Sequence, residues 1–323
     1  MRLPEWLSQA IEQELEGTDH VRLKQAVTYL TARYQEANFT GPIIASEALR
    51  AAYLAVRMPA TYAVVTRVLE EILRLAPGVE IDSLLDLGSG PGTALYAAAE
   101  VFPAIQQVTA LEADAELAAM GRRLGAHSQH EAVRNTRWIP SDLRSGVNAS
   151  RHDLIVLSYA LGELPDAAVK KVISDAWAAA QEFLVIIEPG TKRGFGVVHS
   201  ARSWLKAAGA PVLAPCPPVN ECPMAVAGDW CHFSARVERT SMHRRLKGGA
   251  LGHEDEKFSY IVASRRPLAP APSRIVRHPQ KNSGFVRLEL CTPRGLEKRT
   301  VTRSQKDSYR PARKAEWGDG WEG

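Results

Sequence analysis

The stretch "VEIDSLLDLGSGPGTALYAAAEVFPAIQQVTALEAD" at residues 79–114 constrains the fold more than any other part of the chain. Ser83–Leu87 is a short apolar run that ends in glycines, a helix pattern follows over Thr93–Val101, and a second strand pattern ends at Glu112. A strand, a tight glycine turn, a helix and a second strand form a βαβ unit. The stretch therefore predicts a parallel sheet with helices packed on it.

The same alternation continues downstream. A third strand pattern ends near Asp142, a fourth covers residues 153–158, and a buried strand pattern covers "EFLVIIEPG", with the helix pattern "DAAVKKVISDAWAAA" between the last two. Four strands separated by helices predict an α/β fold with a doubly wound sheet, covered on both faces.

Three parts are expected along the chain. Residues 1–78 have apolar side chains at three- and four-residue steps, which predicts a helical N-terminal subdomain in which Pro59 separates two helices. Residues 79–266 form the α/β domain, including a Cys-rich segment at 211–235 and one late strand pattern at 256–266. After the linker "PLAPAPS", residues 267–323 form a small β-rich basic extension, with "GFVRLELC" and "EKRTVTR" as candidate strands.

The glycine loop "DLGSGPGT" narrows the ligand class, because glycines at a helix N-terminus let a ligand approach the backbone. A dinucleotide loop requires G-x-G-x-x-G, whereas this loop has G-x-G-x-G with Thr93 where the last glycine belongs. The spacing instead resembles the S-adenosylmethionine (SAM) loop of class I methyltransferases, a Rossmann-like fold. The resemblance implies that Glu112 binds the ribose hydroxyls, that Asp142 contacts the adenine amino group, and that Asp86 faces the positively charged methionyl end. The predicted cofactor-binding residues are Asp86, Gly88, Ser89, Gly90, Gly92, Glu112, Asp142 and Ser158.

No residue is assigned a catalytic role. Methylation of a planar amino group commonly uses "[DN]PP[YF]" after the fourth strand, and this chain has "SYALGEL" there. Methylation at cytosine C5 needs a cysteine near the donor, but all four cysteines lie outside the predicted sheet core. Ser158, Tyr159 and Glu163 either line an acceptor site or form a plain loop.

The cysteines gather in one irregular segment. They follow the pattern Cys216-x5-Cys222-x8-Cys231, with Cys291 far downstream. Four thiolates bind zinc tetrahedrally or hold an iron–sulfur cluster. These spacings are wider than the close pairs of structural zinc sites and suit the larger perimeter of a cluster, but zinc and unligated thiols stay open. Two histidines, His232 and His243, are substitute ligands or ordinary hydrogen-bonding residues.

Charge is spread unevenly. From Arg265 to the C-terminus the chain has 14 Lys and Arg against 6 Asp and Glu, so the remainder of the +4 chain is slightly acidic. A basic tail indicates a polyanionic partner such as RNA, or simply a solvated surface. Candidate RNA contacts are Arg244, Arg245, Lys247, Gly248, Gly249, Arg299, Arg303, Arg310, Arg313 and Lys314, with Tyr309 or Trp317 for base stacking.

The N-terminal "MRLPEWLSQAIEQELEG" indicates neither a signal nor a transit peptide, and no run reaches the roughly 18 apolar residues of a spanning helix. We therefore expect a cytoplasmic protein with no membrane partner.

Taken together, the motifs resemble a known family, the methyltransferase-like proteins of the mitochondrial ribosomal small subunit and their bacterial relatives. The matching elements, from about residue 40 to 320, are "AYLAVRMPATYA", "LLDLGSGPGT", "SYALGEL", "IIEPGT", "CP…CP…WCHF", "HRRLKGG…GHEDEKFSY" and "YRPARKAEWGD". The resemblance implies a [4Fe–4S] cluster on the four cysteines, association with small-subunit ribosomal RNA, and a role in ribosome assembly or translation. We expect the chain to be a monomer when it is off the ribosome. A non-catalytic assembly factor of the same fold, and a small-molecule methyltransferase with structural zinc, are the alternatives.

Overall fold

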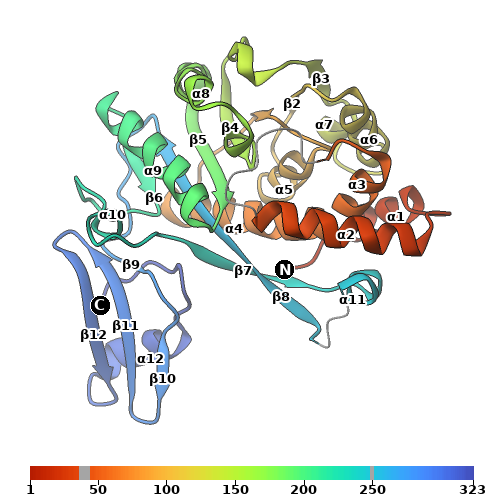
Figure 1. Ribbon diagram of the computed structural model, residues 1–323. Helices are drawn as coiled ribbons and strands as arrows, with labels where there is room; N and C mark the ends of the chain where they lie inside the picture. Colours follow the sequence, from red (N-terminus) through yellow and green to blue (C-terminus); the bar gives the residue numbers. More distant parts are fainter. Residues whose placement is uncertain (36–43, 248–250) are drawn as a thin grey trace.

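The computed structural model describes residues 1–35, 44–247 and 251–323, and its centre is one large mixed sheet (Figure 1). The eight strands run in the order β3-β2-β1-β4-β5-β8-β6, and β7 pairs with the free end of β8. Strands β1 to β5 are parallel, while β8 is antiparallel to β5, β6 and β7. This is the class I methyltransferase fold. The strand bounds are β1 (Ser83–Leu87), β2 (Gln107–Glu112), β3 (Arg137–Pro140), β4 (His152–Ser158), β5 (Ala180–Pro189), β6 (Val212–Ala214), β7 (Phe233–Glu238) and β8 (His253–Ser264).

The βαβ unit read from the sequence is present residue for residue. β1 and β2 flank α5 (Thr93–Val101), which begins directly after Gly92 in the left-handed region. The late strand pattern forms β8, which lies inside the sheet beside β5 and runs antiparallel to it. The sheet is therefore mixed, whereas the sequence predicted a doubly wound sheet of parallel strands.

Two apolar cores cover the two faces of the sheet, because successive strand side chains point to opposite sides. Leu84 belongs to the core under the N-terminal helices, and Leu85 belongs to the core under α8 (Asp166–Ala179) and α9 (Lys192–Ala207). Helices α6 (Ala115–Gly125) and α7 (Glu131–Arg134) also belong to the α/β part.

The N-terminal region is helical, as predicted. It contains α1 (Glu5–Glu14), α2 (His20–Gln35), α3 (Glu47–Ala52), the π-helix η1 (Tyr53–Arg57) and α4 (Met58–Leu75). Pro59 lies in the first turn of α4, which follows η1 without a break, and the Met58 N–H just before it donates to the Tyr53 carbonyl in the π-helical pattern. The junction predicted at Pro59 is therefore made by η1. No described helix is long and apolar enough to cross a membrane.

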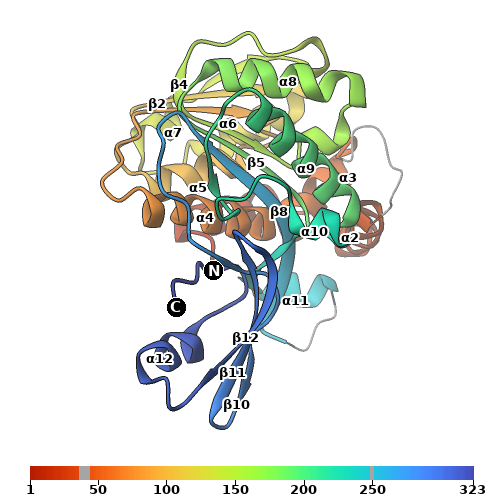
Figure 2. The same cartoon turned by 90° about the vertical axis from the view of Figure 1, so that its left-hand side faces the viewer.

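A second, four-stranded sheet projects from the main body in both views (Figures 1 and 2). It consists of β9 (Arg274–Ile275), β10 (Gln280–Asn282), β11 (Phe285–Thr292) and β12 (Gly295–Thr302), with α12 (Lys306–Lys314) packed on it. The segment after α12 returns to α4, where Arg67 donates to Asp319 at 2.6 Å. Because α4 contacts both the main sheet and this returning segment, the division at residues 78 and 266 stays a prediction.

Candidate functional site

The glycine loop has the backbone that its sequence predicts. Gly88, Gly90 and Gly92 have φ of +67°, +53° and +89°, a region that side chains other than hydrogen disfavour. A Cβ on Gly88 would lie 2.8 Å from Cβ of Ala160, and one on Gly92 would lie 3.0 Å from the Tyr96 hydroxyl. A Cβ on Gly90 would meet nothing within 4 Å. Packing therefore requires the outer two glycines, and the middle one leaves room for a ligand.

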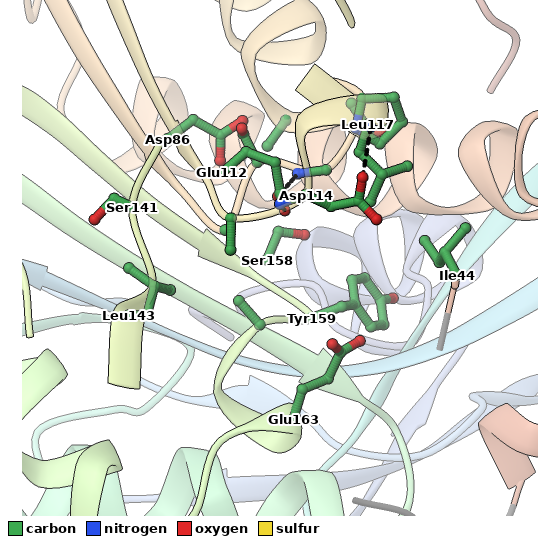
Figure 3. A pocket seen from close by; sticks show the side chains of 18 of the residues that line it. Ile44, Asp86, Glu112, Asp114, Leu117, Ser141, Leu143, Ser158, Tyr159 and Glu163 are labelled. Atoms are coloured by element: carbon green, nitrogen blue, oxygen red, sulfur yellow. Dashed lines mark hydrogen bonds between the residues drawn. The ribbon is translucent and has the colours of Figure 1, made fainter. Parts of the chain in front are cut away.

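A cavity of about 280 Å³ opens at the carboxyl ends of β1, β2 and β4, where ligands bind in open α/β sheets (Figure 3). Tyr159 and Glu163 also line this cavity, which we call the SAM cavity after the ligand that the glycine-loop sequence predicts. Gly92 is the one predicted cofactor residue outside its lining. The predicted residues that line it are Asp86, Gly88, Ser89, Gly90, Glu112, Asp142 and Ser158.

Glu112 is held rigidly at the end of β2. Its Oε2 accepts from the backbone N–H of Gly90 at 2.7 Å, and its Oε1 accepts from that of Asp114 at 2.8 Å. Burial raises the pKa of Glu112, and these N–H donors oppose the rise. Each carboxylate oxygen keeps a further lone pair, so the side chain is oriented and still able to accept from a diol.

Asp86 is the most deeply buried of the predicted carboxylates, with 1% of its surface exposed. Its Oδ2 has no hydrogen-bond partner among the described residues. Burial raises the pKa of Asp86 to about 7, although the backbone N–H of Leu95 lowers it in part. An unpartnered buried oxygen on the SAM cavity is a fitting acceptor for an ammonium group.

Asp142 already has a partner. It caps the short 3₁₀-helix η2 (Leu143–Ser145) by accepting from the backbone N–H of Arg144 at 2.9 Å, and it pairs with the guanidinium of Arg144 at 2.6 Å. Hydrogen bonds from Arg144 lower the pKa of Asp142. The predicted contact between Asp142 and an adenine amino group would share this carboxylate with Arg144.

The "SYALGEL" segment is firmly anchored beside the SAM cavity. Buried Glu188 accepts from the backbone N–H of Leu161 at 3.0 Å and of Gly162 at 3.2 Å, which fixes the 3₁₀-helix η3 (Leu161–Glu163). Burial, with repulsion from Glu188, raises the pKa of Glu163 to about 8. The hydroxyl of Ser158 is buried without a partner in the described part of the chain.

Sequence reasoning missed the contribution of the N-terminal helices. Tyr53 on η1 and Thr61 on α4 line the SAM cavity, and the Tyr53 hydroxyl lies 2.9 Å from that of Thr93. Their one sequence signal is a pair of polar side chains inside the apolar run "AYLAVRMPATYA".

The four cysteines come from four places and line one cavity of about 40 Å³. Cys216 follows β6, Cys222 precedes α10 (Pro223–Val226), Cys231 precedes β7, and Cys291 lies on β11. All four are free thiols. The structure therefore brings together the residues that the sequence predicts as ligands, which we call the four-cysteine site.

The donor set of this site, four thiols on one cavity, fits a metal centre. Burial and the neighbouring thiolates raise the pKa of Cys231 strongly and that of Cys291 to about 12. A bound cation would offset this repulsion and release the thiol protons. Within the described ranges, no three Cys, His, Asp or Glu side chains meet in metal-binding geometry, so the predicted [4Fe–4S] cluster is not shown.

His232, His243 and Trp317, which the sequence suggested as ligands or base-stacking residues, are buried among other side chains. His232 stacks on Trp230 with ring centroids 5.2 Å apart, and His243 pairs with Glu254 at 3.2 Å, so neither lines the four-cysteine site. Trp317 is buried with the edges of two histidine rings against it, which corrects the prediction that it stacks on a base.

The candidate RNA contacts form two separate groups. Arg244 and Arg245 lie exposed on α11 (Ser241–Lys247), which Figure 1 shows on the opposite side of the view from α12 and β12. The second group surrounds α12, with half-buried Tyr309 packed against the small sheet. The side chain of Lys247, and Gly248 and Gly249, lie outside the described residues. The second group consists of Arg299, Arg303, Arg310, Arg313 and Lys314.

A family model described as "Mitochondrial small ribosomal subunit Rsm22" matches residues 47–322. The chain belongs to the Rsm22 family. This Rsm22-family chain is 27% identical over 330 aligned residues to the human "Ribosome assembly protein METTL17, mitochondrial", which covers 95% of this chain and 68% of that protein. It is 23% identical over 293 residues to "Ribosome assembly protein RSM22, mitochondrial" of Saccharomyces cerevisiae, which covers 57% of this chain and 46% of that protein. The chain thus spans less than half of the yeast relative.

Among solved structures, the magnesium protoporphyrin IX methyltransferase (ChlM) of Synechocystis PCC 6803 with bound SAM has a TM-score of 0.42 and 10% identity, over 82% of this chain and 99% of that chain. The comparisons also correct one prediction. The cytoplasmic location expected from the sequence is wrong, because the family description and the names of both relatives are mitochondrial.

Proposed function

We propose that this Rsm22-family chain binds SAM in the SAM cavity and acts, as a monomer, on the ribosomal RNA of the small subunit during ribosome assembly. Membership of the Rsm22 family supports the ribosomal part. The observation that carries the SAM part is the meeting of Glu112, the open face of Gly90 and the unpartnered oxygen of Asp86 in one cavity.

Three carboxylates of the cavity would contact different groups of SAM. Glu112 would accept from the ribose hydroxyls, Asp86 would accept from the amino group, and Asp142 would orient the adenine while paired with Arg144. Bound SAM would supply an activated methyl group. Ser158 and Glu163 lie on the acceptor side of the same cavity, where a hydroxyl and a high-pKa carboxyl would face the incoming group.

We also propose that the four-cysteine site holds a [4Fe–4S] cluster, with zinc as the alternative. Such a centre would supply structural cross-linking and a localised negative charge. Cys291 belongs to the small sheet and the other three cysteines to the segment next to β6 and β7, so ligation would tie the two parts together. Binding free energy would then become folding free energy for the basic extension.

The test is transfer of labelled methyl from SAM to immature small subunits. A Gly90→Arg variant, whose side chain enters the open space of the cavity, should lose SAM binding and transfer while keeping its circular dichroism spectrum. Arg144→Ala is the matched control, because it changes the cavity rim and leaves the loop intact. Absence of transfer to both immature and mature subunits would reject catalysis.

A second function, a non-catalytic assembly factor, is favoured by a specific observation. The carboxylate of Asp142 is occupied by Arg144, and the segment after β4 lacks the "[DN]PP[YF]" motif. Under this alternative, RNA binding and growth complementation survive Gly90→Arg.

A further inference from the structure

Two arginines line the four-cysteine site, and both are buried. Arg202 on α9 is 5% exposed and Arg274 on β9 is 1% exposed. A buried guanidinium without full compensation is costly, so its presence calls for a negative partner. The partners found among the described residues satisfy each side chain only in part.

Arg274 lies directly beside a cysteine. It is the register partner of Cys291 in the antiparallel pair of β9 and β11, an arrangement that puts both side chains on one face of the sheet. Its Nε donates to the carbonyl of Pro215 at 2.7 Å and its Nη1 to Glu71 at 2.6 Å. Its Nη2 is buried and has no partner in the described residues.

Arg202 approaches the site from the other side. Its Nη2 donates to the carbonyl of Val219 at 2.9 Å and its Nη1 to that of Asn220 at 3.3 Å, in the loop between two of the cysteines. Its Nε is buried and makes no hydrogen bond within the described ranges. Its positive charge opposes the rise that burial produces in the pKa of Cys216. Cys216 also interacts with Arg202 through a side-chain hydrogen bond, and no carboxylate among the described residues pairs with Arg202.

We propose that Arg202 and Arg274 are the counter-charges of the four-cysteine site, and that their unused N–H groups donate to the sulfur ligands of the bound centre. The inference rests on the proposed iron–sulfur function. Four thiolates around a core of charge 2+ carry a net charge of 2−, and the two guanidiniums carry 2+. Glu71 offsets part of the charge on Arg274, whereas Arg202 has no such partner.

The charge balance predicts opposite shifts for two substitutions. Reduction by an external one-electron donor adds a negative charge to the site, so a nearby positive charge favours the reduced form. Arg202→Met should lower the equilibrium constant for reduction of the site about tenfold, as expected for charges a few ångströms apart. This corresponds to a midpoint potential lower by about 59 mV for one electron. Glu71→Gln keeps a hydrogen-bond acceptor but removes a negative charge, so it should raise the midpoint.

The experiment uses the full chain, purified without oxygen, with dithionite titration followed by electron paramagnetic resonance. Arg202→Lys is the matched control, because it keeps an amine cation on α9 but loses the guanidinium fork, so its midpoint should lie between those of Arg202→Met and the unmodified protein. A loss of packing alone would shift Arg202→Met and Glu71→Gln in the same direction, and this would overturn the proposal.

A second measurement covers variants that do not retain the cluster. A four-thiolate zinc site has the same net charge, so Zn²⁺ affinity measured by chelator competition should fall by about tenfold in Arg202→Met and recover in Arg202→Lys. Equal affinity in the Met and Lys variants would also overturn the proposal. Absence of iron, sulfide and zinc from the unmodified protein would instead reject the proposed metal centre itself.

Discussion

Replacing Asp86 with asparagine removes a buried carboxylate whose Oδ2 has no partner among the described residues. Burial raises the pKa of Asp86 to about 7 in the folded protein, against about 3.9 in an unfolded chain. The folded state therefore holds this proton more tightly than the unfolded state does. Its contribution to stability is fully present below pH 4 and is lost as the pH rises toward 7.

The size of the effect follows from the shift. Three pKa units correspond to at most about 4 kcal/mol of unfolding free energy, which the unmodified protein loses at about 1.4 kcal/mol for each pH unit between 4 and 7. The asparagine side chain carries no such penalty, because an amide does not titrate. We therefore expect the unfolding free energy of Asp86→Asn, relative to the unmodified protein, to increase between pH 4 and 7 and then level off.

Urea unfolding at pH 5, 6, 7 and 8 measures this difference directly. Asp142→Asn is the control, because Asp142 is partly exposed and paired with Arg144, so its effect should be below about 1 kcal/mol. The pKa of Asp142 is lowered from an ordinary value below 4, so this effect should not change between pH 5 and 8. A difference for Asp86→Asn that does not change with pH would refute the reasoning. Asp86→Asn should also bind SAM more weakly, because Asp86 costs stability but supplies the carboxylate that would accept from the SAM amino group.

Three further outcomes are expected. Gly90→Arg should abolish SAM binding in calorimetry, at a backbone cost of about 1–2 kcal/mol because its φ is +53°; retained binding would place the ligand elsewhere. Cys222→Ser should remove the iron and acid-labile sulfide that we expect in near-equal amounts in the unmodified protein, and its melting temperature should match that of the unmodified protein without a cluster; zinc without sulfide would contradict the cluster. Arg310→Ala with Arg313→Ala should reduce the slope of log affinity against log salt for single-stranded RNA by about 1.4; an unchanged slope would exclude α12 from the phosphate contacts.

The parts of this molecule that the sequence predicted are those coded by neighbouring residues. The bounds of β1, α5 and β2 follow from apolar runs interrupted by glycines, and the strand ends then place Glu112 and Asp142 at one edge of the sheet. Tyr53 could not be placed in this way, because its position depends on how η1 packs against α5, about 40 residues away.

Trp317 was misjudged for a related reason. Aromatic and basic residues give a segment the same composition whether its aromatic side chains face RNA or pack inward. Composition alone therefore carries no information on burial. In the structure the tail returns to α4 through the ion pair of Asp319 with Arg67, and this return covers Trp317. The exposed arginines of α12 lie on the part of the extension that does not return.

The position of β8 explains how one chain supports both candidate sites. Its apolar half is fully buried between β5 and β6, while its polar half pairs with β7 alone. Glu256 on the polar half holds Arg57 of η1 through two hydrogen bonds of 3.0 and 2.9 Å, beside the SAM cavity. Ser259, further along the same strand, donates to the carbonyl of Cys231 at 2.7 Å. The hydrophobic pattern of β8 predicts that the strand is buried. Only its pairing with β7 and the hydrogen bond from Ser259 show that β8 links the cysteine segment to the sheet that carries the SAM cavity.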